Sequence, residues 1–215
     1  MHLKQFLVPS LLAFALAGAG DVWAADLNVR GQIQPVGACS LTLRNGGITD
    51  LGTLTFKQVA EGPLLMIGAN LYHRIAAIDE QLTVACPMQT RVSLRALDNR
   101  RSSADNPFTF GLGFGNGKKA GWFRLNASAA VGDGRGIALL YRWDDDTSWR
   151  EQAFWGVEWA DDSVDVSWAE SGHTLPQAFE TLEIKVTGDV AVSNTLDTHS
   201  EVALDGSATL ELRYL

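Results

Sequence analysis

The chain has 215 residues, of which 46% are hydrophobic and 20% are charged, and its formal net charge at pH 7 is −8. These proportions suit one globular domain or at most two, and they exclude a disordered or collagen-like chain. The acidic excess repels phosphate backbones, so we expect no nucleic-acid partner. Two cysteines and four scattered histidines cannot form a structural zinc site of the Cys-x-x-Cys type.

The first 24 residues have the composition of a secretory signal peptide. Lys4 precedes an apolar run at residues 6–16, which is followed by small residues and by the tripeptide Val22-Trp23-Ala24. A membrane anchor is the alternative, but the apolar run is shorter than the about 20 residues that a spanning helix needs. We therefore expect cleavage after Ala24 and a mature, exported domain at residues 25–215.

The two cysteines, Cys39 and Cys86, are the only pair in this chain. Thiols that enter an oxidising compartment as a single pair usually form a disulfide. We expect a Cys39–Cys86 bridge, and closing a loop of this length stabilises a fold by about 4 kcal/mol on the chain-entropy model. A catalytic or metal-binding thiol is the alternative, but neither cysteine has a Cys-x-x-Cys spacing or a histidine close in sequence.

Apolar and polar residues alternate with a period of two along most of the mature chain. The pattern runs from Leu27 to Leu43 and recurs in later segments, at residues 82–86, 92–96, 137–143, 164–168, 182–186 and 208–214. Turn-forming residues separate the strands, at residues 45–47, 102–106, 115–117, 132–134 and 160–163. About a dozen short strands predict a single all-β domain of the β-sandwich type. Only residues 64–78 stay ambiguous, between an irregular crossing and a helical turn.

Five tryptophans stand between positions 143 and 168. Four of them alternate in step with neighbouring apolar residues, at every second position, which predicts a place in the core: Trp143, Trp155, Trp159 and Trp168. Trp149 differs because it follows the acidic turn Asp144-Asp145-Asp146, and exposed aromatic rings are common anchors for ligands. Trp149 is therefore the candidate ligand contact, with a bracing role in the turn as the alternative. The three carboxylates suit either a calcium loop or a solvated turn.

Groupings of residues that are typical of enzymes are weak in this chain. Ser171-Gly172-His173 brings a serine and a histidine together without a Gly-x-Ser-x-Gly elbow. The glycines between positions 111 and 117 alternate and do not follow the dinucleotide-binding spacing. We therefore expect no catalytic activity, no cofactor and no metal.

Three stretches of the chain resemble the family DUF1120, whose members are usually described as probable fimbrial subunits. They are VRGQIQPVGAC at residues 29–39, VSLRALDNR at 92–100 and LDGSATLELRYL at 204–215. A first strand that ends in Cys39, a second strand that ends in Cys86 and a last strand that ends in Tyr214-Leu215 also resemble a bacterial pilin of the chaperone–usher class.

The resemblance implies an immunoglobulin-like β-sandwich that lacks its last strand. The open groove and the unpaired sheet edge of such a fold are filled by a strand from another chain. The implied partners are a periplasmic chaperone, an outer-membrane usher and other fimbrial subunits, and the implied location is the cell surface, reached through the periplasm.

The two ends of the mature chain supply the candidate interface residues. One face of the last strand carries no charge, and with the terminal residue it forms the expected chaperone or subunit interface: Ala208, Leu210, Leu212, Tyr214 and Leu215. The candidate donor strand at the amino terminus is residues 27–33, with these residues on one face: Leu27, Val29, Gly31 and Ile33. The alternative is that residues 27–33 form the first half of this subunit's own first strand, in which case the chain accepts a strand without donating one and stands at a fibre tip.

Two functions from different classes follow from the sequence. The first is a structural or tip subunit of a surface fimbria, which is assembled by strand exchange and supports adhesion to a host glycan or surface receptor. The second is an independent carbohydrate-binding module or adhesin with a complete sandwich, which uses Trp149 and the loops at residues 111–117. The first is expected to be unstable without a chaperone, whereas the second is expected to be a soluble monomer.

Overall fold

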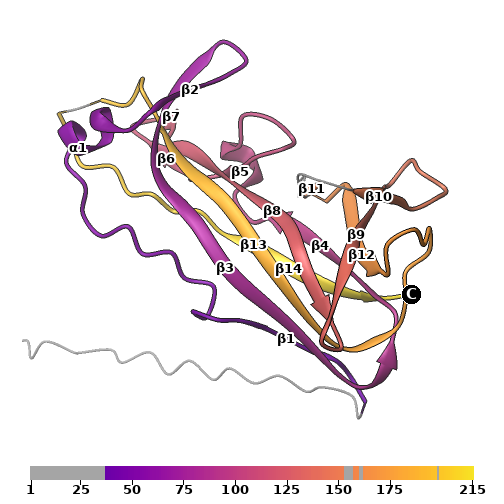
Figure 1. Cartoon of the computed structure of the whole chain (residues 1–215). Helices are drawn as coiled ribbons and strands as arrows, with labels where there is room; N and C mark the ends of the chain where they lie inside the picture. The colour runs from indigo at the N-terminus through magenta and orange to yellow at the C-terminus, as the bar shows by residue number, and fades with distance from the viewer. Residues whose placement is uncertain (1–36, 153–156, 160–161, 198) are drawn as a thin grey trace, which may run out of the picture. The chain divides into compact units, whose positions relative to one another are not determined.

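The computed structural model of the chain describes residues 37–152, 157–159, 162–197 and 199–215 (Figure 1). Contacts divide the chain into two units, Met1–Gln34 and Pro35–Leu215, and all the elements described below belong to the second unit. The expected signal peptide and the candidate donor strand at residues 27–33 lie outside the described residues, and so does Trp155.

Antiparallel strands dominate the fold, and their hydrogen bonds follow the order β1-β3-β13-β8-β9-β12-β4-β14. The first layer contains four of these strands and three short additions, which are β1 (Ser40–Leu43), β3 (Asn70–Thr90), β13 (Phe179–Ser193), β8 (Gly121–Gly132), β2 (Leu64–Ile67), β5 (Phe110–Gly111) and β11 (Val157–Glu158). The second layer contains β9 (Arg135–Trp143), β12 (Val164–Ala169), β4 (Val92–Asp98), β14 (Ala208–Tyr214) and the short β10 (Arg150–Gln152). The all-β sandwich expected from the sequence is confirmed.

The two layers are joined at one side by the hairpin between β8 and β9. Only the last three residues of β8 pair with the first three of β9, after which the strands separate into the two layers. The turn contains Asp133, whose φ of 46° lies in the left-handed region that aspartate tolerates better than most residues. A small separate ribbon is formed by β6 (Phe114–Gly115) and β7 (Lys118–Lys119) around Asn116, whose φ is 51°.

The ambiguous stretch at residues 64–78 is neither an irregular crossing nor a helical turn. It forms the hairpin of β2 with the first part of β3, in which Ile67 pairs with Asn70. The α-helix lies just before it, as α1 (Phe56–Glu61), and begins with a capping box between Thr55 and Gln58. A short 3₁₀-helix, η1 (Arg101–Ser103), occupies one of the expected turns.

The core lies between the layers and consists of the apolar rows that the period-two pattern predicts. The rows of four central strands supply buried side chains, which are Leu82 and Val84 of β3, Leu182, Ile184 and Val186 of β13, Val164, Val166 and Trp168 of β12, and Val92, Leu94 and Ala96 of β4. Trp159 and Trp168 are fully buried, as parity predicts, and Trp143 is half-buried against the same core. Burying such rows is the main favourable contribution to folding.

Candidate functional site: a groove between two sheet edges

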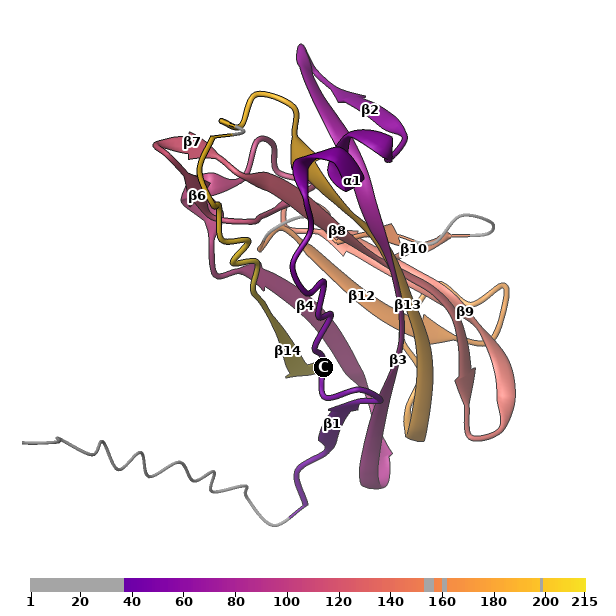
Figure 2. The same ribbon diagram turned by 90° about the vertical axis from the view of Figure 1, so that its left-hand side faces the viewer.

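The side of the sandwich opposite the β8–β9 hairpin is bordered by two strand edges. Among the described residues, β1 pairs only with β3, and β14 pairs only with β4, so each strand ends its layer. In Figure 2 the segment that leads from β1 to α1 passes between β14 and β3. This segment, residues 44–55, is assigned to no strand.

A largely apolar cavity of about 270 Å³ lies between these edges. Its lining comes from both layers and includes Leu43 of β1, Ile78 of β3, Val186 of β13, Phe123 and Leu125 of β8, and Ala208 and Leu210 of β14. A second cavity of about 380 Å³ continues toward α1, and the two share Thr49, Leu51 and Leu204 as lining residues. We call the two cavities together the edge groove.

The last strand contributes the expected face to the edge groove. Ala208, Leu210 and Leu212 are half-buried and pack against the core, whereas Tyr214 is 57% exposed and Leu215 is 50% exposed. Of the predicted interface residues, Ala208 and Leu210 line the groove, whereas Leu212 and Tyr214 of the same strand and the following Leu215 lie beyond its lining. Their incomplete burial leaves apolar surface that another strand can cover.

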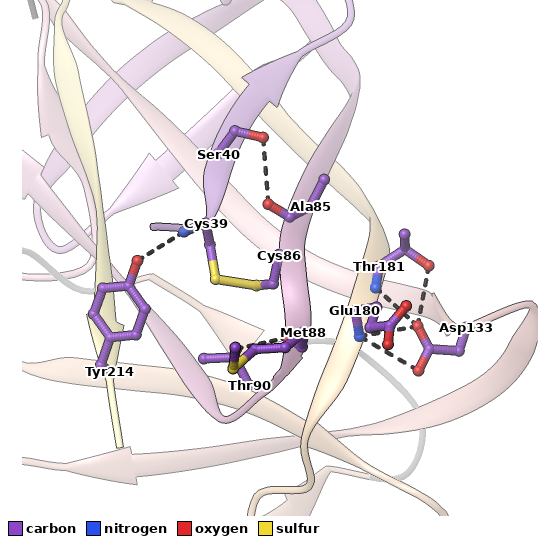
Figure 3. The surroundings of a disulfide bond; sticks show 10 residues. All are labelled: Cys39, Ser40, Ala85, Cys86, Met88, Thr90, Asp133, Glu180, Thr181 and Tyr214. Atoms are coloured by element: carbon purple, nitrogen blue, oxygen red, sulfur yellow. Dashed lines mark hydrogen bonds between the residues drawn. A yellow bond between two sulfur atoms is a disulfide. The ribbon is translucent and has the colours of Figure 1, made fainter. Parts of the chain in front are cut away.

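The predicted disulfide is confirmed, and Figure 3 shows it beside Tyr214 of β14. The sulfur atoms of Cys39 and Cys86 are 2.07 Å apart, and the bridge joins the residue before β1 to β3. The backbone N–H of Cys39 donates to the hydroxyl of Tyr214 at 2.8 Å. The disulfide fixes the start of β1 to β3, and the hydrogen bond holds the end of β14 beside it.

The segment before β14 approaches the core closely at Gly206. A Cβ atom at this position would lie 2.6 Å from Cδ2 of Leu112 and 3.0 Å from Cε1 of Phe123. Only glycine lets the backbone lie this close to side chains that cannot move far in a packed interior. Gly206 therefore sets the depth of the edge groove beside β14.

One acidic residue, Glu80, lines the apolar cavity. It belongs to the inward row of β3, between Ile78 and Leu82, and is only 8% exposed. Sequence reasoning did not select it, although a carboxylate inside a period-two apolar row is a signal that the sequence contains. Buried carboxylates are rare unless they have partners.

Trp149, the candidate ligand contact, lies away from the edge groove. It is 8% exposed and packs with Leu140 and Ala169, and the Arg142 guanidinium lies over its ring at 4.7 Å. A cation over an indole face is itself stabilising. These contacts within the chain therefore account for the buried position of Trp149. The ligand role of Trp149 stays a prediction.

The acidic turn before Trp149 takes part in a charged network. Asp144 and Asp165 accept hydrogen bonds from the buried guanidinium of Arg95, and Asp146 pairs with Arg150 at 2.8 Å. Burial alone would raise the pKa of Asp165, but hydrogen bonds from Arg95 and Arg142 outweigh this and hold the pKa below its usual value. Within the described ranges, no group of three or more His, Cys, Asp or Glu side chains is placed to hold a metal ion.

The described residues thus form an all-β sandwich with an apolar groove between its two edge strands. A family model described as "Protein of unknown function (DUF1120)" matches residues 27–118, so this part of the chain is similar to that family. The match covers two of the three stretches that resemble the family and not the one at residues 204–215. No curated protein and no solved structure matches the chain. No helix among the described residues is long and apolar enough to cross a membrane.

Proposed function

We propose that this chain is a structural or tip subunit of a bacterial surface fimbria, assembled by the chaperone–usher route through strand exchange. It is exported through the periplasm to the cell surface, where it supports adhesion. Its partners are a periplasmic chaperone, an outer-membrane usher and other fimbrial subunits. The observation that carries the proposal is the apolar edge groove between the edges of β1 and β14.

An unpaired edge strand beside an apolar groove invites an added strand. Backbone groups of such an edge are free to pair with another chain, and proteins usually blunt their edges with charge, proline or a covering loop. The β14 edge carries half-buried Leu210 and Leu212 toward the core side. A strand laid in the groove gains backbone hydrogen bonds and buries its own apolar row, which is the mode of recognition called β-augmentation.

The register of β1 supports residues 27–33 as a strand donated to another subunit. Ser40 pairs with Ala85, and each step back from Ser40 advances one residue along β3, so the end of β3 at Thr90 would lie opposite position 35. The strand that follows, β4, already pairs with β12 on one edge and β14 on the other. In this register β3 therefore ends before it could pair with residues 27–33.

The alternative function is an independent carbohydrate-binding module or adhesin, and one observation favours it. Phe108, Tyr141 and Trp143 line a cavity of about 300 Å³ together with Glu158, and Phe108 is 45% exposed. Aromatic rings with a carboxylate nearby suit the apolar faces and hydroxyls of a sugar. This ligand class is also compatible with a tip subunit that binds a host glycan or surface receptor.

The proposal is tested by a charge placed on the groove side of β14. Leu212→Asp puts a carboxylate where a partner strand would cover it, so we expect the chain to lose co-purification with the periplasmic chaperone of its host. Thr209→Asp places the same charge on the exposed face of the same strand and is expected to retain the chaperone. Equal recovery of the chaperone with both variants would overturn the proposal.

A further inference from the structure

Glu80 is a carboxylate in an otherwise apolar part of the edge groove. On β3 it stands between Ile78 and Leu82 in the inward row, and across the sheet it pairs with Val186 of β13. Its side chain is among the buried polar groups of the fold, with 8% of the residue exposed. The apolar neighbours named here cannot hydrogen-bond to it.

Among the described residues, only one of the two carboxylate oxygens of Glu80 has a hydrogen-bond partner. The Asn45 side chain donates from Nδ2 to Oε1 at 2.8 Å. Oε2 is buried and has no hydrogen-bond partner among the residues that the structure describes. Burying a charged oxygen without a donor carries an uncompensated desolvation cost, so such an atom in a binding groove points to a donor that arrives with the ligand.

We propose that Glu80 selects the strand that fills the edge groove, by accepting a hydrogen bond from a side-chain N–H in the inward row of that strand. The inference rests on the proposed function, because it requires that the groove accepts a strand. The occupant is an extended segment with alternating apolar side chains and one lysine, arginine, asparagine or glutamine at the position that faces Glu80. A strand without such a donor leaves Oε2 unpaired and binds more weakly.

The chain's own candidate donor strand does not meet this requirement. Its apolar row has no side-chain hydrogen-bond donor: Leu27, Val29, Gly31 and Ile33. Turning the strand by one residue would present Asn28, Arg30 and Gln32 instead, but this places three polar side chains against an apolar lining. The groove therefore takes its strand from a different subunit in preference to a second copy of this chain.

The test measures binding of synthetic peptides to the full chain. The parent peptide has the sequence of residues 25–35, and four further peptides carry lysine in place of Leu27, Val29, Gly31 or Ile33. Lysine can only donate hydrogen bonds, so it reports on an acceptor. For each peptide, the dissociation constant is measured by fluorescence anisotropy with the unchanged chain and with Glu80→Leu.

We expect coupling between Glu80 and one peptide position. At that position, the ratio of the lysine peptide's affinity to the parent's affinity falls at least about tenfold when Glu80 is replaced by leucine. Glu80→Gln keeps the acceptor that Asn45 uses and puts an amide near the place of Oε2, so it should also lose the preference for lysine. Glu183→Gln removes an exposed carboxylate from the solvent face of β13 and is expected to leave the ratio unchanged.

Two outcomes would overturn the inference, and they separate it from the proposed function. If the peptides bind but the ratios are the same for the unchanged chain and both Glu80 variants, Glu80 selects nothing, while the groove still accepts a strand. If no peptide binds the unchanged chain, Glu80 selects no strand of this pattern and the inference fails, while the proposed function is decided by the Leu212→Asp and Thr209→Asp variants. Retained peptide binding by Glu80→Leu, with coupling at a single position, supports the inference and shows that the variant is folded.

Discussion

Arg95 and Asp165 form a buried ion pair in the second layer. Arg95 is 5% exposed and Asp165 is 3% exposed, and Nε of Arg95 donates to Oδ1 of Asp165 at 2.9 Å. Arg142 and Arg213 also reach Asp165, at 3.1 Å and 3.4 Å. One carboxylate therefore links side chains from β4, β9 and β14, the last of which borders the edge groove.

Replacing Asp165 by alanine is expected to destabilise the fold strongly. The change removes the buried partner of the Arg95 guanidinium and leaves it only the exposed carboxylates of Asp144 and Asp162. Breaking a buried ion pair in this way costs about 3–5 kcal/mol. The free energy of unfolding, measured by urea denaturation, should fall by that amount. Asp145→Ala is the control, because Asp145 is exposed, and it should change stability by less than about 0.5 kcal/mol.

The same pair gives a pH dependence whose sign is fixed by the lowered pKa of Asp165. A carboxyl group whose pKa is lower in the folded state than in the unfolded state stabilises the fold above its unfolded pKa, which is about 3.9. This contribution is lost as the pH falls through the folded pKa. The stability difference between the unchanged chain and Asp165→Ala should therefore be constant near neutral pH and shrink below about pH 4. A difference that shrinks on raising the pH from 5 to 8 would contradict this account.

At the scale of elements, alternation located the strands whose inward rows carry large apolar side chains. The rows of β4, β12 and β14 could be read from the sequence because Val, Leu and Trp stand at every second position. The sequence pattern did not identify β8, since its buried positions include Ala127 and Ala130 and its pairing with β13 has a register shift. Small side chains and an irregular register both weaken a period-two signal.

The period-two pattern also did not predict the full length of β3. Its first half contains His73 and Arg74, which interrupt the alternation, and its pairing with β13 shifts register between Val190 and Ala191. Such a strand is held by its neighbours on both sides rather than by its own pattern, because β strand preference depends on packing more than on intrinsic propensity. Contacts with neighbouring strands therefore keep β3 continuous, where the sequence pattern indicated separate segments.

Asp133 ties three elements together, and its removal is predicted to loosen them. In Figure 3 its carboxylate faces the start of β13, where it accepts hydrogen bonds from the N–H groups of Thr181 and Glu180. Gln89 of β3 donates to the same carboxylate at 2.8 Å. Asp133→Ala removes these acceptors and places alanine at a φ of 46°, so the free energy of unfolding should fall by about 1–2 kcal/mol.

The conservative variant is the control for the turn. Asp133→Asn keeps one side-chain oxygen as acceptor and tolerates the left-handed conformation, so its loss of stability should be clearly smaller than that of the alanine variant. Both are measured by urea denaturation at neutral pH. Equal losses for alanine and asparagine would contradict this account, because asparagine keeps one acceptor and the tolerated backbone conformation.

At the scale of the whole molecule, the sequence predicted one border of the edge groove but not its interior. The uncharged face of β14 was visible because Leu210 and Leu212 alternate with charged residues close to the chain end. Glu80 stands far away in sequence and meets this face only through the sandwich, where both line or border the same groove. The order of strands in space, which no local pattern encodes, creates the site.

Removing the last two residues, Tyr214 and Leu215, tests whether the whole sandwich depends on a partner. The deletion leaves the core rows of β3, β4, β12 and β13 intact, but it shortens the β14 edge and removes the hydroxyl that accepts from the Cys39 N–H. We expect the truncated chain to lose co-purification with the chaperone and to be degraded in the periplasm. Tyr214→Phe removes only the hydroxyl and should keep the chaperone, because the edge retains its length and its apolar face. A truncated chain that stays a soluble, stable monomer without any partner would contradict the fimbrial proposal and favour the independent carbohydrate-binding module, since a complete sandwich needs no strand from outside.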